Sequence, residues 1–323
     1  MTNYNKTEVF KIKHTIKITA IILGMFLITQ LIGLYIVNFY MNDGIELPYG
    51  FSESPTIEQE QSFQKSILTS IVVSFIIAIF LIFLLMKTQL VWILRGWFFI
   101  VISLSLGITF SVILILLNIP YASKIALGIG AIFAFIKVFQ KNILVHNFTE
   151  LLIYPGIAAI FVAMLNLWTT IILLIIISIY DIWAVWHSGV MQKMAKYQIN
   201  SVGVFSGFFI PYASKAIREK IKLLKLKYKD SKIPSNIIKK NKIKVNLAIL
   251  GGGDVIFPII AAGVVLKTFH SFLASMIVIL GATLALLYLF AFAEKKKFYP
   301  AMPYITTGIF IGMLISWIIL NLF

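Results

Sequence analysis

The sequence predicts an all-α membrane protein that crosses the bilayer nine times. Hydrophobic residues make up 60% of the 323 residues and charged residues only 12%, whereas soluble globular domains are about 45–50% apolar and about 25% charged. The apolar residues also lie in long runs, and a helix needs about 20 of them to cross a bilayer. Composition therefore excludes a soluble domain, a disordered chain, a coiled coil and collagen, and the length allows a single membrane domain, residues 1–323.

The predicted spans follow one another with few residues between them. They lie at about residues 15–41, 66–86, 96–118, 120–137, 147–166, 168–186, 245–267, 271–292 and 300–322. The fourth span is the shortest and contains Lys124, and the fifth and sixth spans meet around Asn166. The first apolar run is too long for a signal peptide, so we expect it to remain as a span.

Basic residues predict how the chain is oriented. Lys and Arg concentrate on the cytoplasmic side of a membrane protein. With the N-terminus inside, 25 of the 28 basic residues fall in inner segments, and fourteen of these lie in the long loop 193–244. The outer loop 42–64 instead contains five acids. We therefore expect a multi-pass protein of the cell membrane, with the N-terminus and loop 193–244 in the cytoplasm and the C-terminus outside.

The charge of the long loop has three interpretations. Ile217, Ile221, Leu224 and Tyr228 recur at helical spacing with lysines offset from them, which favours an amphipathic helix lying on anionic lipid headgroups. A solvated basic loop is the second interpretation. Nucleic-acid binding is the weakest, because no recognition motif accompanies the charge, and we expect no nucleic-acid partner.

Two acids lie at positions where membrane proteins rarely have them. Ten of the twelve acids are in loops or at span edges, but Asp181 and Asp254 lie within the sixth and seventh spans. A carboxylate at the bilayer centre costs at least about 2.5 kcal/mol on insertion scales, so it indicates function unless a buried base pairs with it. No Lys, Arg or His lies deep enough in a predicted span to be an obvious partner.

The two acids are predicted to lie at similar depth. At 1.5 Å per helical residue, Asp181 lies roughly 18 Å from the inner Lys193, and Asp254 lies roughly 15 Å from the inner Lys244. Two carboxyl groups at one level on neighbouring helices can face each other, and in a low dielectric one of them then keeps a proton. One acid and one base result, which is the arrangement of aspartic proteases.

The residues around Asp254 weaken a regular helix. Gly251, Gly252 and Gly253 precede the acid and favour irregular backbone. Pro258 cannot donate a hydrogen bond to the carbonyl of Asp254. Irregular backbone at membrane depth is tolerated where it lines protein or a water-filled cavity. Close packing of helices is the alternative reason for the glycines.

Two further features accompany the acids. Tyr180 adjoins Asp181, so its ring points to another face of the helix, either into a cavity or toward lipid. The ninth span opens with Pro300-Ala301-Met302-Pro303. Two prolines are typical of a helix start, and they also leave backbone groups available to a peptide.

These motifs resemble the signature of GxGD intramembrane aspartyl proteases, the presenilin and signal peptide peptidase family. The signature consists of Tyr180-Asp181 in the sixth span, Gly251-x-Gly253-Asp254 in the seventh and Pro300-Ala301-Met302-Pro303 in the ninth. The resemblance covers all nine spans and the long loop. The cytoplasmic loop and Pro303 resemble presenilins, and the compact length resembles prokaryotic, archaeal homologues. The family's Pro-Ala-Leu reads Pro-Ala-Met here, and because Met302 conserves volume and hydrophobicity we expect function to survive.

The resemblance implies a protease that hydrolyses peptide bonds within transmembrane segments of membrane proteins or signal peptides. It implies Asp181 and Asp254 as catalytic residues. The residues expected to bind substrate are Tyr180, Gly251, Gly252, Gly253, Pro300, Ala301 and Met302. We expect no metal, no cofactor and no obligatory partner subunit, so the partners would be transmembrane substrates and membrane lipid.

Other functions fit the residues less well. An ion-coupled transporter or channel is the alternative, because broken helices with midplane acids also bind protons or sodium; however, no internal repeat relates the two acidic regions. A zinc metalloprotease would need His-Glu-x-x-His, which is absent from the sequence. The nearest approach to a serine-protease motif, Gly203-Val204-Phe205-Ser206-Gly207, has different spacing and is expected in the basic loop.

The orientation can be tested because the chain contains no Cys. We predict that single cysteines introduced at Ser231 and Ser52 are modified from opposite sides of sealed vesicles by an impermeant thiol reagent. The reason is that loop 193–244 carries most of the basic residues, whereas loop 42–64 is acidic. Labelling of both cysteines from the same side would refute the predicted number of spans.

Overall fold

The structure, a computed structural model, describes residues 16–41, 45–51, 60–88, 90–140, 142–187, 194, 197–198, 203, 205–212, 246–293 and 299–322. Within these residues, nine helices are long and apolar enough to cross a membrane, which confirms the predicted all-α polytopic fold. They are α1 (Ile16–Met41), α2 (Glu60–Thr88), α3 (Val91–Leu116), α4 (Ala122–Phe139), α5 (Ile143–Met164), α6 (Leu167–Ile182) with its π-helical extension η3 (Trp183–His187), α10 (Gly252–Phe269), α11 (Phe272–Phe292) and α12 (Met302–Leu322). The amphipathic helix predicted around Ile217–Tyr228 lies outside the described residues.

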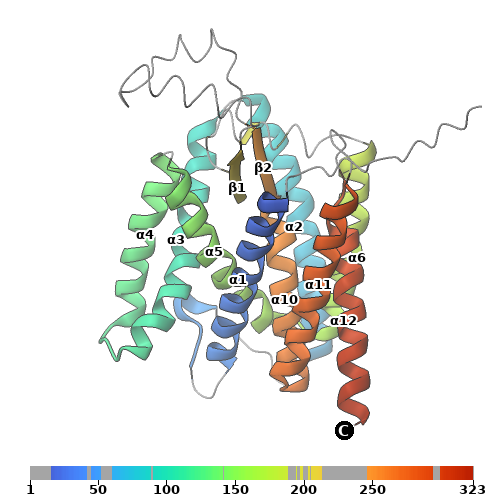
Figure 1. The fold of residues 1–323 in the computed structure, drawn as a ribbon. Coiled ribbons are helices and arrows are strands. Elements are labelled where there is room, and N and C mark those ends of the chain that lie inside the picture. The colour runs from blue at the N-terminus through green and yellow to red at the C-terminus, as the bar shows by residue number, and fades with distance from the viewer. Residues whose placement is uncertain are drawn as a thin grey trace, which may run out of the picture.

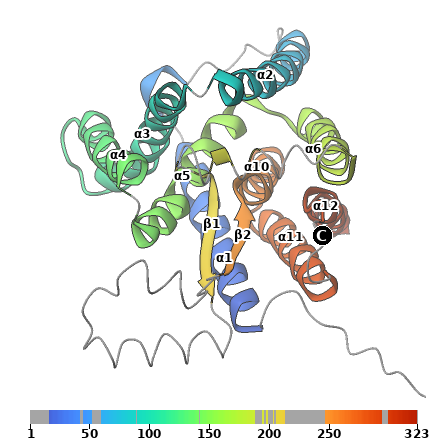
Figure 2. The same cartoon turned by 90° about the horizontal axis from the view of Figure 1, so that it is seen from above.

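Helix α10 is at the centre of the bundle, and α2 is at its edge. Figure 2 shows α10 surrounded by other helices, and it packs against α1, α5, α6, α11 and α12. The most apolar stretch of α10 is 61% buried, whereas that of α2 is only 11% buried. The seventh span, which carries Asp254, is therefore held on all sides by protein, while α2 presents most of its surface to lipid.

A two-stranded antiparallel sheet lies at the end of the bundle where α1 begins (Figure 1). It pairs β1 (Gly207–Tyr212) with β2 (Asn246–Gly251), and Gly207 is the partner of Gly251. The prediction of a seventh helical span from residue 245 was therefore wrong for its first turns, and the basic loop contains a strand that was not expected. A short apolar run such as residues 247–250 is compatible with either a strand or a helix, and the partner strand decides between them.

The start of α12 is positioned by its contacts with α11 and α6. Gly281 and Gly308 lie at the crossing of α11 and α12, where a Cβ atom on Gly308 would lie 2.6 Å from Cβ of Ala285. On the other side, Ser178 Oγ of α6 donates to Thr306 Oγ1 of α12 at 2.8 Å. These contacts bring the first turn of α12 beside the last turn of α6, where Asp181 lies.

The junction between the fifth and sixth spans is a regular helix start. Asn166 and Thr169 form a capping box at the beginning of α6, and such reciprocal bonds satisfy backbone groups that the first turn leaves unpaired. Gln64 of α2 joins this junction by accepting from Thr169 Oγ1 and donating to the carbonyl of Met164, each at 3.1 Å. The N-terminal end of α2 is thus attached to the bundle by a polar side chain.

Candidate active site

Asp181 lies in the last turn of α6 and is 6% exposed. Its Oδ2 atom accepts a hydrogen bond from the backbone N–H of Met302 at 3.0 Å, across 121 residues of chain. Met302 is the first residue of α12, and the first N–H groups of a helix have no partner within the helix. A helix start therefore supplies the donor that a carboxylate needs in an apolar environment.

Asp254 lies in the first turn of α10, directly after β2. The N-terminal end of a helix favours a negative charge, since the unpaired N–H groups and the helix dipole point toward it. Pro258 lies within α10 and leaves the Asp254 carbonyl without its usual i+4 donor. The strand-to-helix transition thus creates a polar position for Asp254 at the end of an otherwise apolar helix.

The two carboxyl groups belong to one cavity. The cavity has a volume of about 340 Å³, and Asp181 and Asp254 both line it. The other lining residues come from α2, α6, the chain between α6 and β1, β2, α10 and α12, and include Phe75, Ala78, Ile79, Ile177, Phe205, Phe257 and Met302.

Five of the remaining predicted site residues also line the cavity. Tyr180 lines the cavity, which answers the question that the sequence left open, and its ring packs edge-on against Phe75 of α2 with centroids 4.8 Å apart. Gly251, Gly252 and Gly253 also line the cavity. Met302 lines it too, but its N–H is bound to Asp181 rather than open to a peptide.

Pro303, by contrast, lies outside the cavity. It lines a separate groove between α11 and α12, together with Tyr288 and Tyr304. Pro300 and Ala301, which were predicted to bind substrate, precede α12, and neither is among the residues that line the cavity. The proline-rich segment is therefore better understood as the element that presents the Met302 N–H to Asp181.

Gly252 is the most tightly packed of the three glycines. A Cβ atom on Gly252 would lie 2.5 Å from Ser206 Oγ and 2.8 Å from Tyr154 Oη, while a Cβ atom on Gly253 would meet only Phe257 at 3.7 Å. Backbone approach this close is available only to glycine. The middle residue of the motif, which the resemblance leaves variable, is thus the one that this structure constrains most.

Sequence reasoning missed the wall supplied by α2 and by the residues before β1. Ser206 was expected in the basic loop, but it lines the cavity beside Gly252. The Ser206 hydroxyl lies 3.5 Å from Tyr154 Oη, so it forms a hydrogen bond with a side chain of α5. The apolar residues on either side of Ser206 were the only available signal, because a solvated loop rarely contains Gly-Phe-Phe-Ile.

Glu150 is a buried acid of a different kind from Asp181 and Asp254. Glu150 was assigned to a span edge, but its side chain is 1% exposed and forms an ion pair with Lys137 of α4. A buried acid with a buried base is the structural arrangement that Asp181 and Asp254 lack in the described residues. Among those residues, no group of three His, Asp or Glu side chains could hold a metal ion.

The chain belongs to a family of intramembrane proteases. Residues 23–322 match the family described as "Signal-peptide peptidase, presenilin aspartyl protease", so the chain is a member of it and an aspartic endopeptidase by family. The resemblance drawn from the three motifs is therefore confirmed. Among curated proteins, none matches the chain in sequence.

Two solved structures share the fold. One, a presenilin-family intramembrane aspartate protease in space group C222, is 16% identical, with a TM-score of 0.55 over 93% of this chain and 99% of that one. Another, a presenilin-family intramembrane aspartate protease in space group P2, is 17% identical, with a TM-score of 0.54 over 92% and 96% of the two chains. The nine-helix arrangement is thus shared over nearly the whole length.

The packing of the glycines yields a prediction. We expect Gly252→Ala to lower the thermal unfolding midpoint of the detergent-purified protein, because overpacking a tight site typically costs about 1–3 kcal/mol. Gly253→Ala, the matched control, should leave the midpoint unchanged or raise it, since Ala is the better helix former by about 1 kcal/mol. An equal loss of stability in both variants would contradict the packing described for Gly252.

Proposed function

We propose that Asp181 and Asp254 are the catalytic pair of this membrane protease and that they cleave peptide bonds within transmembrane segments of membrane proteins or signal peptides. The observation that carries the proposal is the shared cavity, which is lined by both carboxyl groups and by the backbone of the glycines before Asp254. Among the residues that the structure describes, neither acid has a buried basic partner of the kind that Glu150 has in Lys137.

The mechanism uses a water molecule held between the two carboxyl groups, which share one proton. The ionised carboxyl group removes a proton from the water as the water oxygen attacks the scissile carbonyl carbon. The protonated carboxyl group gives its proton to the carbonyl oxygen, and a tetrahedral gem-diol forms. When the C–N bond breaks, the leaving nitrogen takes a proton from one carboxyl group. A gem-diol hydroxyl returns a proton to the other, so the pair ends as it began.

Each carboxyl group has a donor or dipole that suits this cycle. The Met302 N–H donates to Asp181 Oδ2, and hydrogen bonds to an ionised group are stronger than those between neutral groups. Asp254 lies in the first turn of α10, where negative charge is favoured. Either carboxyl group can therefore carry the negative charge, which a cycle with alternating roles requires.

The substrate must unwind near the cavity, since a helical peptide bond is shielded by its own hydrogen bonds. Ile249 is the register partner of Phe209. Because the N–H and C=O of Phe209 point away from β2, the N–H and C=O of Ile249 are expected to point away from β1, at the edge of β2 beside the glycines. An extended peptide can add to an exposed sheet edge, with main-chain bonds supplying affinity. We infer that the cavity-lining residues Tyr180, Gly251, Gly252, Gly253 and Met302 surround the unwound stretch. We also infer that the sheet lies on the cytoplasmic side of the membrane.

The surroundings follow from the same proposal. Substrates are transmembrane helices that arrive through lipid, and no partner subunit is required for the dyad to form. The N-terminus and loop 193–244 are cytoplasmic and the C-terminus is outside, as the distribution of basic residues favours.

The dyad is tested by single substitutions. Asp181→Asn and Asp254→Asn should each reduce cleavage of a transmembrane substrate in liposomes by about 10²–10⁴-fold, because each removes one of two cooperating acid–base groups. Both variants should insert and melt like the wild type. More than about a tenth of the wild-type activity in either folded variant would rule out the shared-proton mechanism.

A pair of peptide isosteres separates proteolysis from ion transport. An isostere with a hydroxyl in place of the scissile carbonyl mimics the tetrahedral species, and transition-state mimics bind far more tightly than substrates. It should outcompete the matched isostere without the hydroxyl, and only when both acids are present. Equal affinity for the two isosteres in the wild type, together with Asp254-dependent ion flux into sealed vesicles, would favour a transporter.

A further inference from the structure

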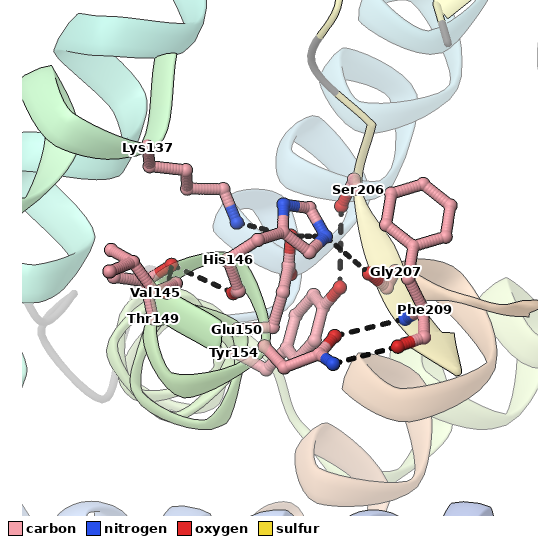
Figure 3. A network of polar contacts seen from close by, with 10 residues as sticks. Lys137, Val145, His146, Thr149, Glu150, Tyr154, Ser206, Gly207 and Phe209 are labelled. Carbon is pink, nitrogen blue, oxygen red and sulfur yellow. Dashed lines mark hydrogen bonds and ion pairs between the residues drawn. The ribbon is translucent and has the colours of Figure 1, made fainter. Parts of the chain in front are cut away.

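The outer edge of β1, the edge turned away from β2, is occupied by side chains of α5. His146 donates from Nε2 to the carbonyl of Gly207 at 2.8 Å. Asn147 Oδ1 accepts from the N–H of Phe209 at 2.9 Å, and Asn147 Nδ2 donates to the carbonyl of Phe209 at 2.7 Å. In Figure 3, dashed lines reach the strand at Gly207 and at Phe209.

Asn147 takes the place of a neighbouring strand. A primary amide has one acceptor and one donor side by side, like the peptide groups of a third strand. In an antiparallel strand, the N–H and C=O of one residue point to the same edge. Phe209 therefore turns both groups toward α5, and the next residue on that edge, Pro211, has no N–H to offer. The β1 edge of the sheet is therefore closed to a further strand. The opposite edge of the sheet is formed by β2.

The closing side chains are themselves fixed. Glu150 follows His146 by one helical turn. It forms an ion pair with Lys137 of α4, and its Oε1 lies 3.6 Å from His146 Nε2. The His146 ring is stacked on Phe209 with centroids 4.8 Å apart. Both charged side chains of the pair are almost fully buried, so α4, α5 and β1 form one connected polar cluster (Figure 3).

The cluster reaches Asp254 through the backbone. The carbonyl of Ser206, the residue before β1, accepts from the N–H of Gly252 at 3.2 Å. Gly252 is the first residue of α10 and lies two residues before Asp254. It is also confined by Ser206 Oγ and Tyr154 Oη, and Tyr154 is a buried residue of α5. A shift of β1 relative to α5 must therefore move the first turn of α10.

We propose that Asn147, supported by His146 and the Lys137–Glu150 pair, is a positioning residue of the active site, because its two hydrogen bonds to Phe209 hold β1, and through Ser206 and Gly252 the carboxyl group of Asp254, in line with Asp181. The inference rests on the proposed function of the dyad. Asn147 does not touch the substrate or the water, and it acts only through the strand. Misplacement by about 1 Å can cost on the order of 10²-fold in rate.

The test compares two asparagines of the same helix. Asn147→Ala removes both bonds to β1. Asn142→Ala, the matched control, removes the N-cap of α5, in which Asn142 Oδ1 accepts from the N–H groups of Leu144 and Val145. Loss of such a cap costs about 1 kcal/mol of stability without touching β1. Both variants should therefore be destabilised, but only Asn147→Ala should have a displaced pair of carboxyl groups.

The readout is the ratio of affinities for the isosteres with and without the hydroxyl, measured on folded, full-length protein in detergent. This ratio reports how well the two carboxyl groups converge on the hydroxyl, and a fraction of unfolded protein changes the number of sites but not the ratio. We expect Asn147→Ala to reduce the ratio by about 10- to 100-fold and to reduce kcat in parallel, while Asn142→Ala keeps the wild-type ratio.

A second variant keeps the proposal testable if Asn147→Ala does not fold. Asn147→Asp retains the acceptor for the Phe209 N–H and loses the donor to its carbonyl, so its ratio should also fall. An unchanged ratio in the folded Asn147 variants, or an equal fall in Asn142→Ala, would overturn the positioning role and leave the protease intact. A wild type that does not discriminate between the isosteres would instead overturn the proposed dyad itself.

Discussion

A carboxylate inside a bilayer depends on backbone groups that are not already paired, and the candidate active site is built around the few places where the fold supplies them. A continuous helix satisfies its own N–H and C=O groups and offers none to a neighbouring acid. Two interruptions of the helical pattern solve this problem. The first turn of α12 gives the Met302 N–H to Asp181, and the strand-to-helix transition at Gly252 places Asp254 at the start of α10.

Those interruptions must in turn be supported by the protein, because lipid cannot satisfy irregular backbone. The strand before Asp254 is paired on one side by β1, and β1 is bound on its other side by His146 and Asn147. The Lys137–Glu150 pair then holds α5 against α4. Removing one partner of a buried pair leaves an uncompensated charge and typically costs about 3–5 kcal/mol. Helices distant from the dyad in sequence thus contribute to its geometry.

The sequence predicted the helices and the two acids, but it did not predict the sheet or the supporting cluster. Spans are set by runs of about 20 apolar residues, and a lone acid inside such a run is visible without any tertiary information. The depth of Asp254 was estimated from Lys244 by helical rise, although residues 246–251 form a strand, which rises about 3.3 Å per residue. The error had little consequence, since both acids line one cavity.

The supporting cluster could not be predicted because its members look ordinary one at a time. Lys137 and Glu150 each lie at the end of an apolar run, a position that predicts a side chain extending to the membrane surface. Only the packing of α4 on α5 shows that they are buried together. Asn147 and Phe209 are 62 residues apart, and no periodic pattern relates a helix side chain to the edge of a strand in a loop.

The departure from the family motif at Met302 has a simple structural explanation. The contact with Asp181 is made by the backbone N–H of Met302, and its side chain is buried at 3% exposure. Leu and Met have similar volumes, and exchanges between them in a core usually cost less than about 1.5 kcal/mol. The motif therefore constrains where the helix begins more than which apolar side chain begins it. The position of the helix is fixed by the close crossing of α12 with α11 at Gly281 and Gly308.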